Sequence, residues 1–409
     1  MPKIAPFRAV RPHRDKAHLV GSRSYLSYSG KDLEDKLEGN PFTFLHVLRP
    51  EMHAGERLKV DRLARYQLVN DEYKSFFDKD ILQKEAEPSF YIYRQTKGPQ
   101  TFKGIIAGVA VEEYLEGHVK IHEQTITFRE RIFQEYLEIT GFNAEPVLLT
   151  YEGREAIDTL VDSIVAERPE YEFYTTDKVK HELWVVGDKE IQQRLIDEMA
   201  LVPDVYIADG HHRCASSALL SGMKGHGQSQ PFNRFMSLLM PSSELKIYEY
   251  NRLVKELNGL SAQEFISALK ESFEVSAAGG PVQAKGFHHL TMYLGGEWYD
   301  LHVKKDKVGN DPVSKLDTRI LTNQVLRPIL GIEDIRTDKR ISFIDGLQGI
   351  EGIQRAVDSG RYAVGFSLFP VTFEQLKTVS DCGAIMPPKS TWIEPKLRTG
   401  LTIYELFED

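Results

Sequence analysis

Five consecutive residues, Asp209-Gly210-His211-His212-Arg213, combine side-chain types that can bind a negatively charged group. They follow residues 205–208, an apolar run typical of a buried strand, and a helical pattern begins directly after them. We therefore expect them at the open end of a sheet, where α/β folds tend to bind ligands. The first N–H groups of a helix are unpaired and partly positive, glycine allows close approach, and arginine can bind phosphate or carboxylate through two N–H groups. The sequence predicts an anion site here, with phosphate as the leading candidate.

A charged turn with an ordinary helix cap is the alternative for this stretch, and it would explain any one of its polar residues. The five residues together favour a binding role, because crowding so many polar groups costs stability unless they have partners or a ligand. Cys214 follows them on the apolar face of the helical pattern. We interpret this cysteine as a packing residue, since a free cysteine usually behaves as a small hydrophobe.

A second polar group, His122, Glu123 and Thr125, precedes the start of another predicted helix. Thr125 or Thr127 could cap that helix, with Glu130 completing a capping box. Capping accounts for the threonine but leaves His122 and Glu123 unexplained. A solvated pair is the alternative for these two residues.

A third polar group, Lys389, Ser390 and Thr391, follows the prolines Pro387 and Pro388. Two consecutive prolines impose an extended, polyproline-like backbone, which would present the three side chains in a fixed way. These residues either contact a substrate or phosphate, or belong to a C-terminal strap that ties the domains together.

The elements that must position these groups alternate between strand and helix patterns, which predicts a mixed α/β fold. Strands are expected at 88–95, 146–151, 181–186, 205–208 and 234–240, and helices at 60–82, 127–139, 155–166, 190–201 and 316–330. Residues 42–48 also have strand composition. The pair His288-His289 lies on a strand pattern and is interpreted as structural.

The amino-acid composition argues against several classes of protein. The chain has 409 residues, is 41% hydrophobic and carries a net charge of −9, which argues against a broad nucleic-acid-binding surface. No stretch approaches the roughly 18 apolar residues of a membrane span, and the first residues lack a signal-peptide core. Two cysteines, Cys214 and Cys382, give no disulfide framework, so we expect a cytoplasmic protein.

Several common cofactor motifs are absent from the sequence. There is no P-loop, no G-x-G-x-x-G after a strand, no H-E-x-x-H and no paired C-x-x-C. A metal held by a cage of side chains is therefore not expected. Mg²⁺ carried by a nucleotide stays open, because this ion uses few carboxylates together with phosphate oxygens.

Motifs spread over most of the chain carry a family resemblance. They are Ala5-Pro6-Phe7-Arg8 with Arg11-Pro12, Asn40-Pro41 with Phe44-Leu45-His46, Tyr93-Arg94-Gln95, His122-Glu123 with Thr125, Tyr206 to Arg213, Met386 to Thr391, Pro395-Lys396-Leu397 and Gly400-Leu401. Together they resemble the DUF1015 family of uncharacterised proteins. One segment departs from the pattern, because residues 21–27 stand where many members have a Pro-Tyr-Asp-Val-type sequence.

The central stretch is also similar to the nucleotide-binding motif of the ParB/sulfiredoxin superfamily, which includes sulfiredoxin, ParB CTPases and free-serine kinases. The resemblance implies a ParB/sulfiredoxin-like core with additional N- and C-terminal α/β segments. Sulfiredoxin's reactive cysteine corresponds to His211, so its thiol chemistry is not implied. We expect residues 1–255 to form the catalytic or nucleotide-binding core with an N-terminal elaboration, 256–315 a small α/β piece, and 316–409 a C-terminal segment that packs back on the core.

The leading hypothesis is a kinase-like enzyme that uses ATP or ADP to phosphorylate a small hydroxylated metabolite, with free serine as the named candidate. Phosphoryl transfer depends mainly on positioning and charge neutralisation. The nucleotide phosphates are assigned to Gly210, His211, His212 and Arg213, Mg²⁺ or nucleophile orientation to Asp209, general-base catalysis to Glu123, and substrate contacts to His122, Thr125, Lys389, Ser390 and Thr391.

Two other classes of function stay open. The first is a nucleotide-binding switch or regulatory module of the ParB-like superfamily without transfer activity. The second is a structural protein with a vestigial site. The expected partners are a nucleotide and a small-molecule substrate, without nucleic acid or membrane, and a homo-oligomer stays open.

Overall fold

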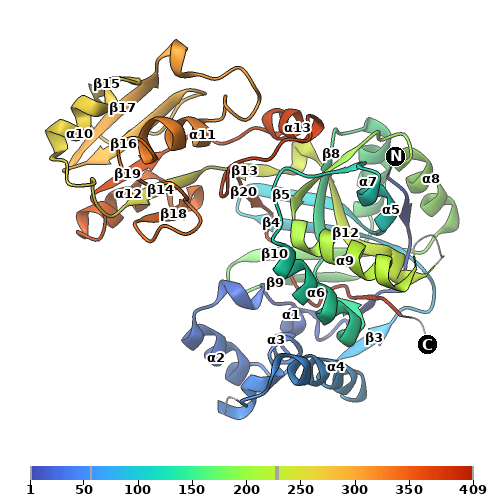
Figure 1. The fold of residues 1–409 in the computed structure, drawn as a ribbon. Helices are drawn as coiled ribbons and strands as arrows, with labels where there is room; N and C mark the ends of the chain where they lie inside the picture. Colours follow the sequence, from blue (N-terminus) through green and yellow to red (C-terminus); the bar gives the residue numbers. More distant parts are fainter. Residues whose placement is uncertain (1, 56–57, 226–229, 408–409) are drawn as a thin grey trace. The chain divides into compact units, whose positions relative to one another are not determined.

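The computed structural model describes residues 2–55, 58–225 and 230–407. The chain forms two compact units (Figure 1). Unit 1 contains Met1–Leu245 and Pro395–Asp409, and unit 2 contains Lys246–Glu394. No described helix is both long and apolar enough to cross a membrane.

Unit 1 is built on a mixed sheet (Figure 1). The strand order is β6-β11-β8-β12-β5-β4-β10-β9, and β1 pairs with β5. The pairs β6–β11 and β8–β12 are parallel, and the other pairs are antiparallel. The strands are β1 (Ile4–Ala5), β4 (Phe90–Lys97), β5 (Gln100–Ala110), β6 (Val119–Lys120), β8 (Val147–Tyr151), β9 (Tyr171–Tyr174), β10 (Val179–Val186), β11 (Val205–Asp209) and β12 (Arg234–Pro241).

The main apolar core of unit 1 joins this sheet to four helices. Buried side chains of α5, α7, α8 and α9 pack with those of the central strands in one cluster. A second cluster joins α1, α3 and α4 to Phe142, Ala144 and Ile403, among others. The helices of unit 1 are α1 (Ala17–Val20), α2 (Gly30–Gly39), α3 (Leu45–Leu48), α4 (Arg62–Asp78), α5 (Val111–Leu115), α6 (Thr127–Thr140), α7 (Glu155–Val165), α8 (Lys189–Met199) and α9 (His211–Lys224).

Four short strands pair outside the main sheet of unit 1. They are β2 (Val10–Pro12) with β3 (Leu82–Lys84), and β7 (Phe142–Asn143) with β21 (Tyr404–Glu405).

Unit 2 is built on an antiparallel sheet in the order β15-β17-β16-β19-β14-β18 (Figure 1). Its strands are β14 (Tyr250–Val254), β15 (Phe273–Ala277), β16 (His289–Leu294), β17 (Glu297–Val303), β18 (Ile341–Asp345) and β19 (Val364–Ser367). Its helices are α10 (Ala262–Leu269), α11 (Asp317–Leu321), which continues into a π-helical turn at Thr322–Leu326, α12 (Gly349–Asp358) and α13 (Phe373–Asp381). A separate ladder pairs β13 (Lys246–Tyr248) with β20 (Trp392–Glu394).

The mixed α/β class predicted from the sequence is confirmed by these sheets. The expected division into three segments differs from the two units. A boundary at 315/316 would cut one sheet, because β19 lies between β16 and β14. Only residues 395–409, rather than 316–409, return to unit 1.

The strand predicted at 42–48 is wrong, because residues 45–48 form helix α3. Phe44, Leu45 and Val47 are fully buried there. Burial in the surrounding clusters, rather than strand propensity, accounts for their apolar character.

Candidate functional site

The turn between β11 and α9 is shaped by a bulge and a glycine. The register between β11 and β8 shifts between Ile207 and Asp209, and such bulges often re-aim side chains beside functional sites. Gly210 is the N-cap of α9, with a φ of 104°. A Cβ atom at this position would lie 3.1 Å from the guanidinium of Arg213. The turn therefore requires glycine for both its backbone angle and its space.

The guanidinium of Arg213 folds back over this turn and is held by several acceptors. Its Nη2 donates to Asp209 Oδ2 at 2.6 Å. Its Nη1 donates to the carbonyl oxygens of Pro146, at 2.5 Å, and Glu145, at 3.3 Å, and lies 3.1 Å from Glu145 Oε1. Burial lowers the pKa of Arg213, but Glu145 and Asp209 outweigh this and raise it. Arg213 therefore braces the turn as a fixed cation.

Lys396 also faces Asp209, although no sequence pattern predicts this residue at the site. Its Nζ lies 3.6 Å from Asp209 Oδ1, and its side chain is 41% exposed. Burial raises the pKa of Asp209, but Lys396 and Arg213 outweigh this and hold that pKa below its usual value. The Pro395-Lys396-Leu397 motif was the available sequence signal, but nothing local connects it to residue 209.

The structure brings His122 and Glu123 to His211, as the leading hypothesis requires. The imidazoles of His122 and His211 meet edge to face, with centroids 4.6 Å apart. The backbone N–H of His122 donates to His211 Nε2 at 3.4 Å, so a neutral His211 carries its proton on Nδ1. That atom lies 3.7 Å from Glu123 Oε2.

Burial keeps the three histidines at this turn uncharged near neutral pH. It lowers the pKa of His122 to about 4, and it lowers the pKa of His211 well below its usual value, with His122 and His212 adding to the effect. Burial and Arg129 lower the pKa of His212. The histidines therefore act as neutral hydrogen-bonding groups rather than as cations.

Two imidazole nitrogens at the turn have no hydrogen-bond partner within the described residues. They are Nδ1 of His122 and Nδ1 of His212, and both atoms are buried. His122 as a whole is only 4% exposed. Buried polar groups are normally satisfied, so these two atoms point to a missing partner.

The capping box predicted before α6 is wrong. The N-cap of α6 is Ile126, which makes no side-chain capping bond. The hydroxyl of Thr125 instead donates to the carboxylate of Glu130. A substrate contact by Thr125 stays a prediction.

Lys389, Ser390 and Thr391 belong to unit 2, and the first two contact other residues of that unit. Ser390 Oγ donates to the carbonyl of Pro387 at 2.6 Å and lies 3.2 Å from Thr318 Oγ1. The Nζ of Lys389 lies over the ring of Tyr250, 5.1 Å from its centroid. Their predicted contact with substrate stays a prediction.

Cys214 lies in the main core of unit 1 and is fully buried. Burial raises the pKa of its thiol, so the sulfur is not a thiolate near neutral pH.

With both of its carboxylate oxygens facing cations, as in this structure, Asp209 does not fit as a Mg²⁺ ligand. Arg213 faces one of its carboxylate oxygens and Lys396 faces the other. Mg²⁺ needs carboxylate oxygens that are free to enter its octahedral shell. We therefore derive no step that passes through a metal held by this residue.

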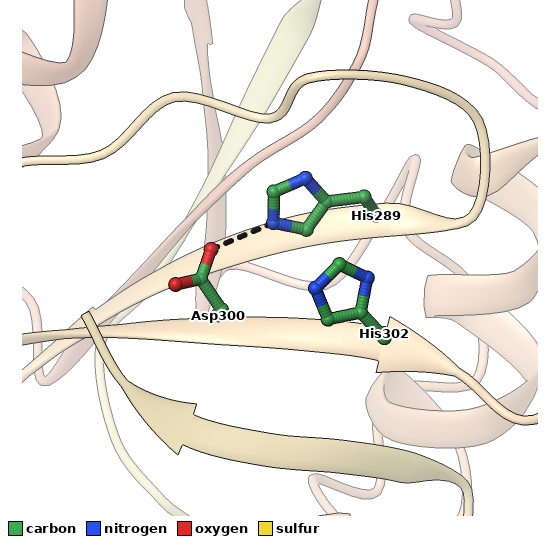
Figure 2. Close-up of side chains that lie close together, drawn as sticks. All are labelled: His289, Asp300 and His302. Carbon is green, nitrogen blue, oxygen red and sulfur yellow. Dashed lines mark hydrogen bonds and ion pairs between the residues drawn. The ribbon is translucent and has the colours of Figure 1, made fainter.

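A separate group of possible metal ligands lies in unit 2. Figure 2 shows His289, Asp300 and His302 on the hairpin β16–β17. One possible ligand atom of each residue lies within 4.8 Å of the others. His289 Nδ1 accepts a hydrogen bond from the Lys285 N–H, so its proton is on Nε2, which lies 2.7 Å from Asp300 Oδ1. The rings of His289 and His302 are nearly parallel, at 13°, so their in-plane lone pairs do not converge on one ion. The group therefore fits a hydrogen-bonded cluster on a sheet, rather than a metal centre.

The chain is similar to several solved structures, with low sequence identities and low TM-scores. Free serine kinase in complex with AMP is 15% identical, with a TM-score of 0.37, covering 74% of this chain and 91% of that one. A C-terminally truncated SbnI from Staphylococcus aureus is 11% identical, with a TM-score of 0.39, covering 73% and 87%. A conserved hypothetical protein from Pyrococcus furiosus is 16% identical, with a TM-score of 0.36, covering 74% and 95%.

Similarity at this level does not transfer a function to the chain. No curated protein has a significantly similar sequence. The family model described as "Protein of unknown function (DUF1015)" matches residues 4–319, which is most of the chain. The protein therefore belongs to the DUF1015 family, as its motifs had indicated.

Proposed function

We propose that the protein is a nucleotide-dependent phosphotransferase, with ATP or ADP as donor and a small hydroxylated metabolite as acceptor. One observation carries the proposal. The 14-residue helix α9 begins without a capping side chain, beside a buried, unpartnered nitrogen of His122. A helix N-terminus of this kind binds phosphate oxygens through its free N–H groups and its dipole. The unpartnered imidazole supplies the second indication that a ligand completes the site.

Glu123 is the proposed general base. Its carboxylate lies beside His211, and its side chain is 56% exposed, so a substrate hydroxyl can reach it. In the transfer, the hydroxyl oxygen forms a bond to the terminal phosphorus, and the bond from that phosphorus to the nucleotide breaks. The hydroxyl proton passes to the carboxylate of Glu123, so ATP leaves as ADP, or ADP leaves as AMP. Free serine is the first acceptor to test, because the resemblance of the central motif to the ParB/sulfiredoxin superfamily, which includes free-serine kinases, suggests it.

The experiment mixes the full chain with ATP or ADP, magnesium chloride and a panel of hydroxylated amino acids, and follows phosphorylated product by phosphorus NMR. Glu123→Gln is expected to keep nucleotide affinity and to slow transfer by about 10²- to 10⁴-fold, because it removes only the proton acceptor. Glu116→Gln is the control, since Glu116 is exposed and ends helix α5. Equal rates for wild type and Glu123→Gln would remove Glu123 from the mechanism, and absence of nucleotide binding by wild type would contradict the proposal as a whole.

A nucleotide-binding switch without transfer is the second candidate. The observation that favours it is the Asp209 carboxylate, which is occupied by two cations and does not fit as a magnesium ligand. The same experiment separates the two functions. Nucleotide binding without phosphorylated product from any acceptor supports the switch.

A further inference from the structure

A nucleotide at α9 brings several negative charges that the predicted residues do not neutralise. His122, His211 and His212 have lowered pKa values and stay neutral near pH 7. Arg213 is already engaged by the carboxylates of Asp209 and Glu145. Among these four residues, no positive charge is uncommitted. The phosphate charge is therefore left to cations outside these four residues, such as Mg²⁺ carried by the nucleotide, Arg129 beside His212, or Lys396.

Lys396 has the position and the exposure that this task requires. Its Nζ lies 3.6 Å from Asp209 Oδ1, whereas Arg213 Nη2 lies 2.6 Å from Asp209 Oδ2. The Lys396 contact is longer than a tight charge-assisted hydrogen bond of about 2.7–2.9 Å, although Lys396 contributes at least as much as Arg213 to the lowered pKa of Asp209. The Lys396 side chain is also more exposed than that of Arg213, at 41% against 19%. Lys396 can therefore move from Asp209 to an incoming anion while Arg213 keeps the turn in place.

The backbone around Lys396 is held firmly, although its side chain is exposed. The carbonyl of Lys396 accepts a hydrogen bond from Nε2 of the buried Gln95 at 3.1 Å. Arg398 donates to both oxygens of Asp177 at 2.8 Å. Thr399 exchanges backbone hydrogen bonds with Ser22. These contacts fix the base of the lysine, so that only its four-carbon stem needs to be ordered on binding.

We infer that Lys396 is the side chain that binds the terminal phosphate of the nucleotide at the N-terminus of α9. This inference rests on the proposed function and adds to it a phosphate-binding residue. Lys396 exchanges Asp209 for phosphate oxygens on binding, and Asp209 stays neutralised by Arg213.

The first test measures the affinities of the full chain for ADP and AMP by titration calorimetry, in wild type, Lys396→Met and Lys396→Arg. Lys396→Met is expected to weaken ADP binding by about 10- to 100-fold, and AMP binding by less, because AMP lacks the terminal phosphate of ADP. Lys396→Arg keeps the charge and is expected to restore most of the affinity. Lys180→Met is the matched control, because Lys180 pairs with Glu182 at 2.9 Å on β10, several strands from β11.

The second test needs no variant. An amine-reactive reagent labels the wild-type lysines with and without ADP, and mass spectrometry locates the labels. ADP is expected to protect Lys396 and to leave Lys180 unchanged. If wild type binds ADP but neither the Lys396→Met affinity nor the labelling of Lys396 changes, this inference fails and the proposed function stands. If wild type binds no nucleotide, both fail.

Discussion

Arg213 in unit 1 is half-buried and Arg252 in unit 2 is fully buried, and the two arginines differ in what surrounds them. Arg213 in unit 1 lies between two carboxylates and two carbonyl oxygens. Arg252 in unit 2 is 1% exposed, stacks over Phe343 and donates through Nη1 to the carbonyl of Tyr250. Its Nη2 has no partner, and no carboxylate among the described residues forms an ion pair with it. Burial lowers the pKa of Arg252 to about 9.

The difference shows which buried charge the fold depends on. Removing the arginine from a part-buried charge cluster leaves carboxylates and carbonyl oxygens with fewer partners, which is costly. Removing an unpaired buried charge relieves a desolvation penalty instead. We therefore expect Arg213 to be required for the shape of its turn and Arg252 to be dispensable for the fold of unit 2.

The largest expected effect tests this contrast directly. Arg213→Met is expected to lower the free energy of unfolding by about 3 kcal/mol, at the low end for a buried pair, because Glu145 and the two carbonyl oxygens lose their donor and Asp209 keeps only Lys396. Arg252→Met is expected to leave that free energy unchanged within about 1 kcal/mol or to raise it, because a flexible apolar chain replaces an unpaired charge. Urea unfolding measures both variants. Arg154→Met is the control for Arg213, since its ion pair with Glu198 is 35% and 30% exposed and is worth at most about 1 kcal/mol. Equal losses at 213 and 252 would break the comparison.

The second prediction concerns the pH dependence of the turn in unit 1. The pKa of His122 is lowered from 6.5 to about 4 in the folded chain. Between these values the unfolded chain binds a proton that the folded chain does not, so stability falls as the pH falls from 6.5 to 4. The total loss from this residue is roughly 3 kcal/mol, from about 1.4 kcal/mol per pKa unit. His122→Gln is expected to flatten the stability curve in this window by that amount. Parallel curves for the two proteins would contradict the neutral state assigned to this histidine.

The smallest expected change in the free energy of unfolding concerns Gly210. Gly210→Ala is expected to cost about 1–3 kcal/mol, because alanine is strained at a φ of 104° and its Cβ would meet the guanidinium of Arg213. Gly117→Ala is the matched control, because Gly117 has a φ of 80° and nothing within 4 Å of an added Cβ. The difference between the two variants in urea unfolding isolates the contact with Arg213. A difference of zero would show that the guanidinium moves aside freely.

The local geometry of the site could be predicted from the sequence. The apolar run, the glycine and the following periodicity predicted a strand that ends where a helix begins, and α9 starts at His211. The same reasoning singled out His122 and Glu123, which lie against His211 in the structure. Both results depend on short-range patterns, which a single sequence carries.

Long-range contacts were not predictable in the same way. Lys396 comes to Asp209 only because the chain returns to unit 1 at residue 395, and no local pattern encodes that return. The sequence also assigned Arg213 to phosphate, because it does not reveal that Glu145 and two carbonyls engage the guanidinium. Thr125 was also predicted as a possible helix cap. Its hydroxyl instead donates a hydrogen bond to the carboxylate of Glu130.

A crystal structure of the protein with ADP is the most direct test of the account. We expect the phosphates at the N-terminus of α9, within hydrogen-bonding distance of the backbone N–H groups of His211 and His212, with Lys396 Nζ on the terminal phosphate and Arg213 still on Asp209. Phosphates bound away from this turn, or a turn that stays unchanged and empty at saturating ADP, would contradict it.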